Sequence, residues 1–305
     1  MLEGVFSLSK IRQENLSWPR DYHVMPAAGY FAGGDAADIS RFDQTTETQS
    51  VAASLREKKS SMSGSGNATY GYYTGGIAQA LSNSIEKFAY MTSTTSTLGA
   101  CLNQAKHLHA AVSSEQFGWH SGGLRDPNAQ ATTARIDRID HVTDTQQVQQ
   151  RCNLISFRSG HASVSERGTG WWLGGLQDPL GYPRTVLSSI EKLSHSTDTE
   201  MIASRAVLTV PRDGARAEHD GKSAYVCGGG DRSICQLDLA TDTVSVSQAQ
   251  NITAMSCHAS TGDNQTAAWF VGTSLEKLSF ATETVSTRHN TATQHRAASI
   301  TNMGY

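Results

Sequence analysis

Short runs in which apolar and polar residues alternate recur along the whole chain and predict β-strands. Clear examples are ISRFD from residue 39, SIEKF from residue 84 and SIEKL from residue 189, each leading into a stretch rich in Thr, Asp or Glu. Alternation with a period of two is typical of a half-buried strand, and Thr and Asp side chains can bond neighbouring backbone groups in a turn. Each run therefore predicts a β-hairpin. Residues 50–59 come closest to a helical period, but their place in the repeat favours a strand and a loop.

A second string, in which a glycine pair follows bulky residues, recurs in step with these hairpins. It reads GYFAGG from residue 29, GYYTGG from 71, GWHSGG from 118, GWWLGG from 170 and, more weakly, AYVCGG from 224 and AWFVGT from 268. The spacings of 42, 47, 52, 54 and 44 residues are close to the roughly 40 to 50 residues of a propeller blade. A polar stretch before each string adds a loop and a strand. The sequence thus predicts an all-β fold, a six-bladed β-propeller with four-stranded antiparallel blades.

The aromatic residues of these strings are predicted to form the core between blades. One occupies the same position in every unit, where the sheets diverge and a bulky ring can fill the space: Tyr30, Tyr72, Trp119, Trp171, Tyr225 and Trp269. The adjacent glycines let backbones approach near the central channel, where a side chain would clash. A stacking platform for sugars or bases is the alternative, but repetition in register favours the core.

The two ends of the chain are predicted to play different parts. Residues 295–305, HRAASITNMGY, resemble the strand that precedes the glycine pair elsewhere, so this C-terminal strand should pair with the first unit and close the ring. Residues 1–22 lie outside the propeller of residues 23–305. They are predicted to be a docking arm for other proteins of an assembly, with Phe6, Ile11, Leu16 and Trp18 available for contact. The alternative is that this arm packs under its own propeller.

The repeat resembles two known kinds of protein. RFDQTTET from residue 41 and QLDLATDT from residue 236 resemble the turn segment of Kelch-type propellers, although the Kelch tryptophan after the turn is missing. RIDRIDHVTDT from residue 135 and FGWHSGGLRDP from residue 117 resemble repeats of tail-fibre-like proteins of marine bacteriophages more closely. This second resemblance covers residue 29 to the C-terminus. It implies a virion component, assembled in the host cytoplasm and present in multiple copies.

Composition and charge narrow the classes of function. The 305 residues carry a formal net charge of −3 and 27 glycines, which suits one large all-β domain without a basic field for nucleic acid. The sequence contains no run of apolar residues long enough to span a membrane and no signal peptide pattern at its start. Five cysteines without a C-x-x-C pair predict neither a disulfide framework nor a zinc ribbon. We therefore expect no nucleic-acid partner and no membrane insertion.

Motifs that would indicate catalysis or a cofactor are missing from the sequence. It contains no G-x-S-x-G, H-E-x-x-H, P-loop or dinucleotide fingerprint. His107 and His109 form an H-x-H pair that would place both rings on one side of a strand, but a third ligand is not apparent and no metal is predicted. Asp126 and Asp178 stand at equivalent places and could pair as glycosidase carboxylates do. An Asp-Pro turn that starts a loop explains them more simply.

Insertions in the third and fourth units are the most informative irregularity. Residues 125–135 and 177–187 follow the glycine pair in consecutive units, so they should project from one face of the disc, which is often the binding face of a repeat fold. An exposed tyrosine and guanidinium contribute strongly to binding. The predicted binding residues are Arg125, Asp126, Asn128, Gln177, Asp178, Tyr182 and Arg184.

The sequence taken as a whole favours a non-enzymatic structural or binding protein. We expect a phage virion component, such as a tail fibre, attachment or decoration protein, whose loops recognise a cell-surface glycan or receptor and whose repeated copies multiply weak contacts. No cofactor is expected. The alternatives are a soluble Kelch-like adaptor that binds a protein at the loop face, and a propeller enzyme that acts on glycans.

Overall fold

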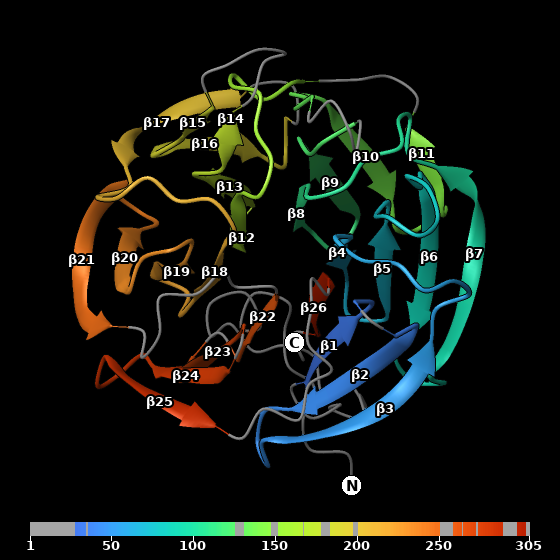
Figure 1. The fold of residues 1–305 in the computed structure, drawn as a ribbon, viewed down its shortest axis with the longest axis horizontal. Helices are drawn as coiled ribbons and strands as arrows, with labels where there is room; N and C mark the ends of the chain where they lie inside the picture. Colours follow the sequence, from blue (N-terminus) through green and yellow to red (C-terminus); the bar gives the residue numbers. More distant parts are fainter. Residues whose placement is uncertain are drawn as a thin grey trace, which may run out of the picture.

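The structure is a computed structural model, and its strands form six sheets arranged in a ring (Figure 1). It describes residues 28–34, 36–125, 131–147, 152–166, 168–177, 184–197, 201–250, 259–263, 265–272, 274–288 and 298–302. Every sheet in the ring has four antiparallel strands, and a two-stranded hairpin stands apart from them. The fold is therefore the predicted all-β, six-bladed propeller.

The blades are numbered along the chain, with their strands given from the inner to the outer edge. The first three contain β26 (Ala298–Asn302), β1 (Ala28–Ala32), β2 (Asp38–Asp43) and β3 (Thr48–Ser54); β4 (Ser63–Gly66), β5 (Tyr70–Thr74), β6 (Ser84–Ala89) and β7 (Thr94–Cys101); and β8 (Ala110–Ser113), β9 (Phe117–Ser121), β10 (Ile136–Asp140) and β11 (Thr145–Gln147). The others contain β12 (Ala162–Glu166), β13 (Thr169–Leu173), β16 (Ser189–Ser194) and β17 (Met201–Val207); β18 (Ala215–His219), β19 (Ser223–Gly228), β20 (Ser233–Asp238) and β21 (Thr243–Gln250); and β22 (Ala259–Gly262), β23 (Ala267–Val271), β24 (Leu275–Ser279) and β25 (Thr284–Arg288).

The C-terminal strand closes the ring, as the sequence predicts. β26 pairs antiparallel with β1 in the register Ala28 to Asn302 through Ala32 to Ala298, so the first blade combines both ends of the described chain. The run at residues 50–59 forms part of β3 and the connection that follows it, as its place in the repeat suggests. The predicted arm residues Phe6, Ile11, Leu16 and Trp18 lie outside the described residues.

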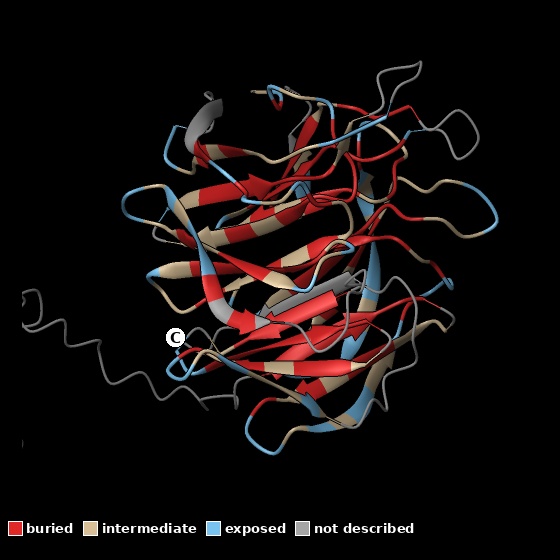
Figure 2. Ribbon diagram, turned by 60° about the vertical axis from the view of Figure 1, so that its left-hand side comes forward, coloured by how far each residue is buried: buried red, intermediate tan, exposed pale blue. Residues whose placement is uncertain are grey.

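The repeated aromatic residues form the core between blades, as predicted. All six of them are buried, and neighbouring rings contact one another, for example Tyr225 with Phe280 and Trp269 with Phe42. Figure 2 shows burial concentrated along the strands and exposure in the turns and along parts of the outer strands. Burial of such large side chains is the main favourable term for a sheet fold of this kind.

The glycine strings allow two different close approaches. The first glycine of a string faces the inner strand of an adjacent blade: a Cβ on Gly118 would lie 2.5 Å from Ser65 Oγ of β4. The glycine pair lies past the end of the second strand and contacts the connection to the next blade instead. Gly76 has φ of 93° and donates its N–H to Lys106 O at 2.9 Å. The prediction that the pair lies between inner strands is therefore correct only for the first glycine.

Replacing Gly76 by alanine should destabilise the propeller by about 3 kcal/mol, because strain at positive φ adds to a steric clash. A Cβ there would lie 2.5 Å from Met62 Cγ and 2.8 Å from Ser60 O. Gly99→Ala is the matched control, since Gly99 is exposed on β7 and its Cβ would meet nothing within 4 Å. The measurement is urea unfolding of both variants. Equal stability of the two variants would contradict this account of the glycine pair.

Buried cations anchor the connections between blades, which we call linkers. Lys59, Lys106 and Arg158 lie in the linkers that enter blades 2, 3 and 4, and each forms an ion pair with an acid on the third strand of the blade it enters. The partners are Glu86 at 2.6 Å, Asp137 at 2.8 Å and Glu191. Each acid also accepts the backbone N–H three residues before the cation, from Arg56, Asn103 and Ile155 respectively. Cation and acid together therefore fix the linker on the next sheet.

The sequence carries a signal for these linkers that the alternation of strands does not reveal. A buried leucine stands four residues before each cation, at Leu55, Leu102, Leu154 and Leu208, the last preceding Arg212 of the linker into blade 5. Neighbouring linkers also bond to one another, since Leu108 N donates to Ser61 O and Gly160 N donates to Leu108 O. The linkers into blades 2, 3 and 4 are thus joined by backbone hydrogen bonds, and we call the side of the ring on which they lie the linker face.

Candidate functional site

The insertions of blades 3 and 4 lie on the linker face. Leu124, directly after the glycine pair of blade 3, exchanges backbone hydrogen bonds with His107 of a linker, and Leu176 of blade 4 does so with Ser159. The second insertion also contains the hairpin of β14 (Leu176–Gln177) and β15 (Thr185–Val186). These contacts place the described ends of both insertions on the same face, which agrees with the prediction. Linkers and insertions together supply the side chains of the site.

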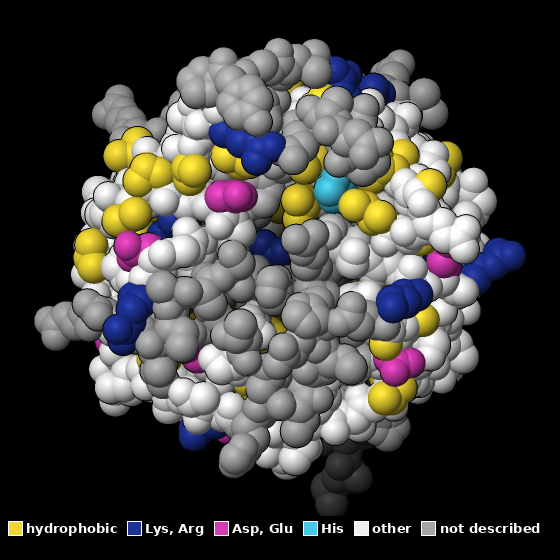
Figure 3. All heavy atoms as spheres, viewed as in Figure 1, with side chains coloured by type: hydrophobic (Ala, Val, Ile, Leu, Met, Phe, Trp, Pro, Cys, Tyr) yellow, Lys and Arg dark blue, Asp and Glu magenta, His cyan; other side chains and the backbone are white. Residues whose placement is uncertain are grey.

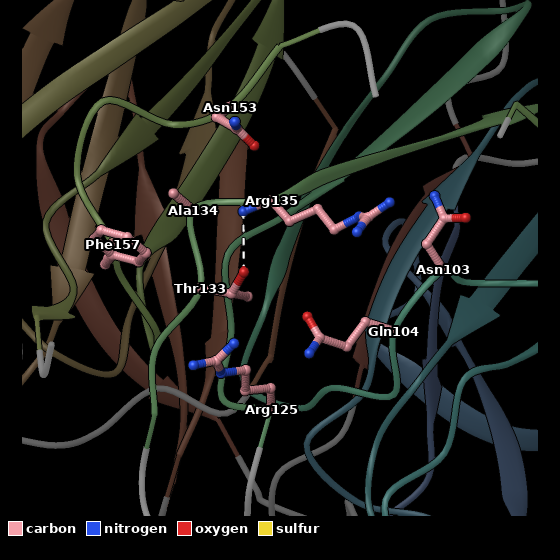
Figure 4. A pocket seen from close by; sticks show the side chains of 8 residues that line it. All are labelled: Asn103, Gln104, Arg125, Thr133, Ala134, Arg135, Asn153 and Phe157. Carbon is pink, nitrogen blue, oxygen red and sulfur yellow. Dashed lines mark hydrogen bonds between the residues drawn. The ribbon is translucent and has the colours of Figure 1, made fainter. Parts of the chain in front are cut away.

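A pocket of about 400 Å³ opens on this face over blade 3 (Figure 4). Three segments line it: the linker into blade 3, the insertion of blade 3 and the linker into blade 4. Its lining residues are Asn103, Gln104, Arg125, Thr133, Ala134, Arg135, Asn153 and Phe157. The volume is within the roughly 300 to 1,000 Å³ range of small-ligand sites. Hydrogen-bonding groups and one aromatic ring thus share a single hollow.

The lining carries positive charge without an acidic residue among these eight. Within the described ranges, the Arg125 guanidinium has no ion pair or hydrogen bond, and its side chain is exposed. Arg135 lies 3.7 Å from Asp137 through Nε and Oδ1, but the fully buried Asp137 is already paired with the fully buried Lys106. Asn103 donates its Nδ2 to the same Asp137 Oδ1 at 2.9 Å. The charge of both arginines therefore remains available to a ligand.

Arg135 marks a departure of blade 3 from the repeat. Four other units have serine at the equivalent position: Ser84, Ser189, Ser233 and Ser274. The serines of blades 2, 4 and 5 accept a hydrogen bond from the linker cation, as Lys59 Nζ donates to Ser84 Oγ at 2.6 Å. In blade 3 the cation Lys106 instead donates to His120 O at 2.8 Å. The residue at this position in blade 3 therefore does not bind the linker cation, and the Arg135 side chain lines the pocket instead.

Three of the predicted binding residues are among those that the structure describes, and one of these three lies in the pocket. Arg125 lines it, whereas Gln177 pairs with Thr185 in the β14–β15 hairpin. Arg184 precedes β15 and acts on Asp213: burial raises the pKa of Asp213, and the charges of Arg216 and Arg184 oppose that rise. Asp126, Asn128, Asp178 and Tyr182 lie outside the described residues. The sequence did contain one signal for the pocket residues that we did not predict. It is Arg135, which stands where four other units have serine.

A group of buried histidines lies between blades 2, 3 and 4. Thr74 Oγ1 is 2.9 Å from both His109 Nε2 and His120 Nδ1, and Ser121 Oγ is 3.0 Å from His161 Nε2. Burial lowers the pKa of each of these three imidazoles well below the ordinary value. They are therefore neutral at pH 7.

The prediction that His107 and His109 lie on one side of a strand is wrong. Both precede β8, and the backbone turns between them because Leu108 has φ of 53°. Among the residues that the structure describes, no three side chains of His, Cys, Asp or Glu are grouped so as to hold a metal ion. In the same ranges, no helix has the length and apolar character needed to cross a bilayer.

Hydrophobic side chains are exposed in the pocket and beside it. Ile155 and Phe157, two residues apart on the linker into blade 4, are 56% and 46% exposed. Figure 3 shows the same face as Figure 1, with hydrophobic side chains visible over blades 3 and 4. This part of the linker face therefore presents both polar and apolar side chains to a ligand or partner.

Comparison with known proteins identifies the architecture. No protein-family model matches the chain, and none of the curated proteins matches it. A solved structure titled "Structure of YjhT" aligns with a TM-score of 0.71 over 87% of this chain and 95% of that chain. The chain is a six-bladed β-propeller. At 11% identity the likeness shows the fold alone, and 746 solved chains match this propeller, so the fold does not select a function.

Proposed function

We propose that this propeller is a non-enzymatic binding protein whose ligand occupies the pocket over blade 3. The observation that carries the proposal is the change at Arg135, where a residue used structurally in other blades becomes a pocket guanidinium. Guanidinium groups stay protonated and carboxamides do not titrate, so these side chains hold a ligand rather than transfer its protons. Buried ion pairs and backbone hydrogen bonds hold the linkers that carry these side chains.

The wider role is a phage virion component, such as a tail fibre, attachment or decoration protein. Support comes from the resemblance of the repeats to tail-fibre-like proteins and from the residues before the propeller, which provide a segment for docking to other virion proteins. Repetition of the disc would then multiply weak pocket contacts through effective concentration. Electron microscopy of native particles is expected to show ordered copies with the linker face outward. Recovery of the chain only as a free monomer would contradict the virion role.

Binding at the pocket is tested with Arg135→Ser, which restores the residue found in four other units. The change removes the 3.7 Å contact of Arg135 with Asp137, but Asp137 keeps its buried partner Lys106, and Lys106 loses no partner. The unfolding midpoint should therefore be unchanged. Binding of the full chain to an array of neutral and acidic glycans should fall by about tenfold. Arg56→Gln, at an exposed arginine of another linker, is the control for loss of charge. Equal binding by all three proteins would exclude this pocket as the site.

A protein-binding adaptor is the second candidate function. The exposure of Phe157 in the pocket and of Ile155 beside it favours this function, because aromatic and aliphatic side chains contribute strongly to protein interfaces. An adaptor would lose its partner on substitution of Ile155 by aspartate and keep it in Arg135→Ser. The glycan-binding role predicts the opposite order of effects.

A further inference from the structure

The two pocket arginines are separated rather than joined in one anion site. Figure 4 shows the Arg135 guanidinium directed toward Asn103, and the Arg125 guanidinium on the other side of Thr133, where Phe157 also lies. A small anion with one charge would contact only one of them. A ligand that uses both needs at least two anionic groups spaced along its length.

The other groups that line the pocket suit a polyhydroxylated chain. Gln104 and Asn153 present carboxamides, which can donate to and accept from hydroxyls. Phe157 is 46% exposed, and its ring offers an apolar face against which a sugar ring can pack. The pocket of about 400 Å³ is lined by three separate segments, so one sugar chain that occupies it can contact all three.

We propose that the ligand of this pocket is an acidic polysaccharide, with successive anionic groups on Arg125 and Arg135 and a sugar ring against Phe157. The shared chemistry is a carboxylate or sulfate carried on a sugar chain. This inference rests on the proposed binding function and adds the class of ligand. Guanidinium recognises both groups through charge-assisted, bidentate hydrogen bonds.

The experiment measures binding of the full chain to polygalacturonate, dextran sulfate and neutral dextran by biolayer interferometry. Binding to at least one acidic polymer is expected, weakening as salt rises because exposed charges are screened. Preference for polygalacturonate identifies the carboxylate, and preference for dextran sulfate identifies the sulfate. Equal affinity for neutral dextran, or binding to none of the three, would overturn the inference.

Variants of the pocket arginines distinguish the acidic class of ligand from the broader proposal that the pocket binds a ligand. Arg125→Gln and Arg135→Ser should each lower affinity about tenfold, and the double variant about a hundredfold, with Arg56→Gln unchanged. Urea unfolding checks that the variants are folded. If the glycan array shows a neutral ligand that Arg135→Ser loses, the acidic class is wrong and the proposed function stands. If neither glycans nor proteins bind at the linker face, both fail.

Discussion

Lowering the pH from 7 to 5.5 is expected to reduce the free energy of unfolding by about 3 to 5 kcal/mol. The cause is a set of histidines that burial keeps neutral in the folded state. The pKa values of His109, His120 and His161 lie well below the ordinary value, and those of His141 and His195 are lowered to about 4. In the unfolded chain the same groups bind protons below about pH 6.5.

The direction of this stability change follows from the number of protons that the folded and unfolded states bind. A group whose folded pKa is depressed binds fewer protons in the folded state, so the stability present above pH 6.5 is lost as pH falls toward the folded pKa. Each of five histidines contributes about 1 kcal/mol over this window. Glu218 acts in the opposite direction, because burial raises its pKa to about 7 and the folded state takes up its proton first. Its contribution offsets part of the loss without reversing it.

The measurement is urea unfolding at pH 7 and at pH 5.5, with tryptophan fluorescence as the signal. His161→Gln provides the comparison, since glutamine can still bond Ser121 Oγ but cannot titrate. This variant should lose about 1 kcal/mol less than the parent over the same pH interval. Identical unfolding midpoints for the parent protein at both pH values would show that these histidines do not remain neutral in the fold.

Lys59→Met is expected to destabilise the propeller by about 3 to 5 kcal/mol, because it leaves Glu86 buried without its counter-charge. Both side chains are only 3% exposed, and their Nζ and Oε1 atoms are 2.6 Å apart. The substitution also removes the hydrogen bond from Lys59 Nζ to Ser84 Oγ. The substitution therefore removes both side-chain contacts of Lys59 with the third strand of blade 2.

The neighbouring residue offers a matched control. Lys58 is exposed, so Lys58→Met removes the same charge and should change stability by less than about 0.5 kcal/mol. The double variant Lys59→Met/Glu86→Met should recover part of the loss, because no uncompensated charge stays buried. The recovery is incomplete since Glu86 also accepts the Arg56 N–H at 2.7 Å. Equal urea midpoints for Lys58→Met and Lys59→Met would contradict a structural role for the buried pair.

Much of the architecture was predictable because short sequence patterns specify its strands and turns, and these patterns repeat in every blade. The period of the aromatic and glycine strings determines six blades, and the alternation around Ile85 and Ile190 determines the third strands of two of them. The lead-in pattern near the C-terminus indicates ring closure, which the pairing of β26 with β1 confirms. Burial of Trp119 and its equivalents follows from their fixed place in the unit.

The pocket and the buried ion pairs depend on tertiary structure. Asn103, Arg125 and Phe157 come from three segments that meet only when two linkers pack against an insertion. Lys106 and Asp137 likewise meet only because the linker packs against the sheet that it enters. The sequence by itself therefore determined the number, order and closure of the blades, since short-range periodicity and repetition specify strands. Only the tertiary structure decided which side chains share the pocket, because that depends on contacts between segments with no common period.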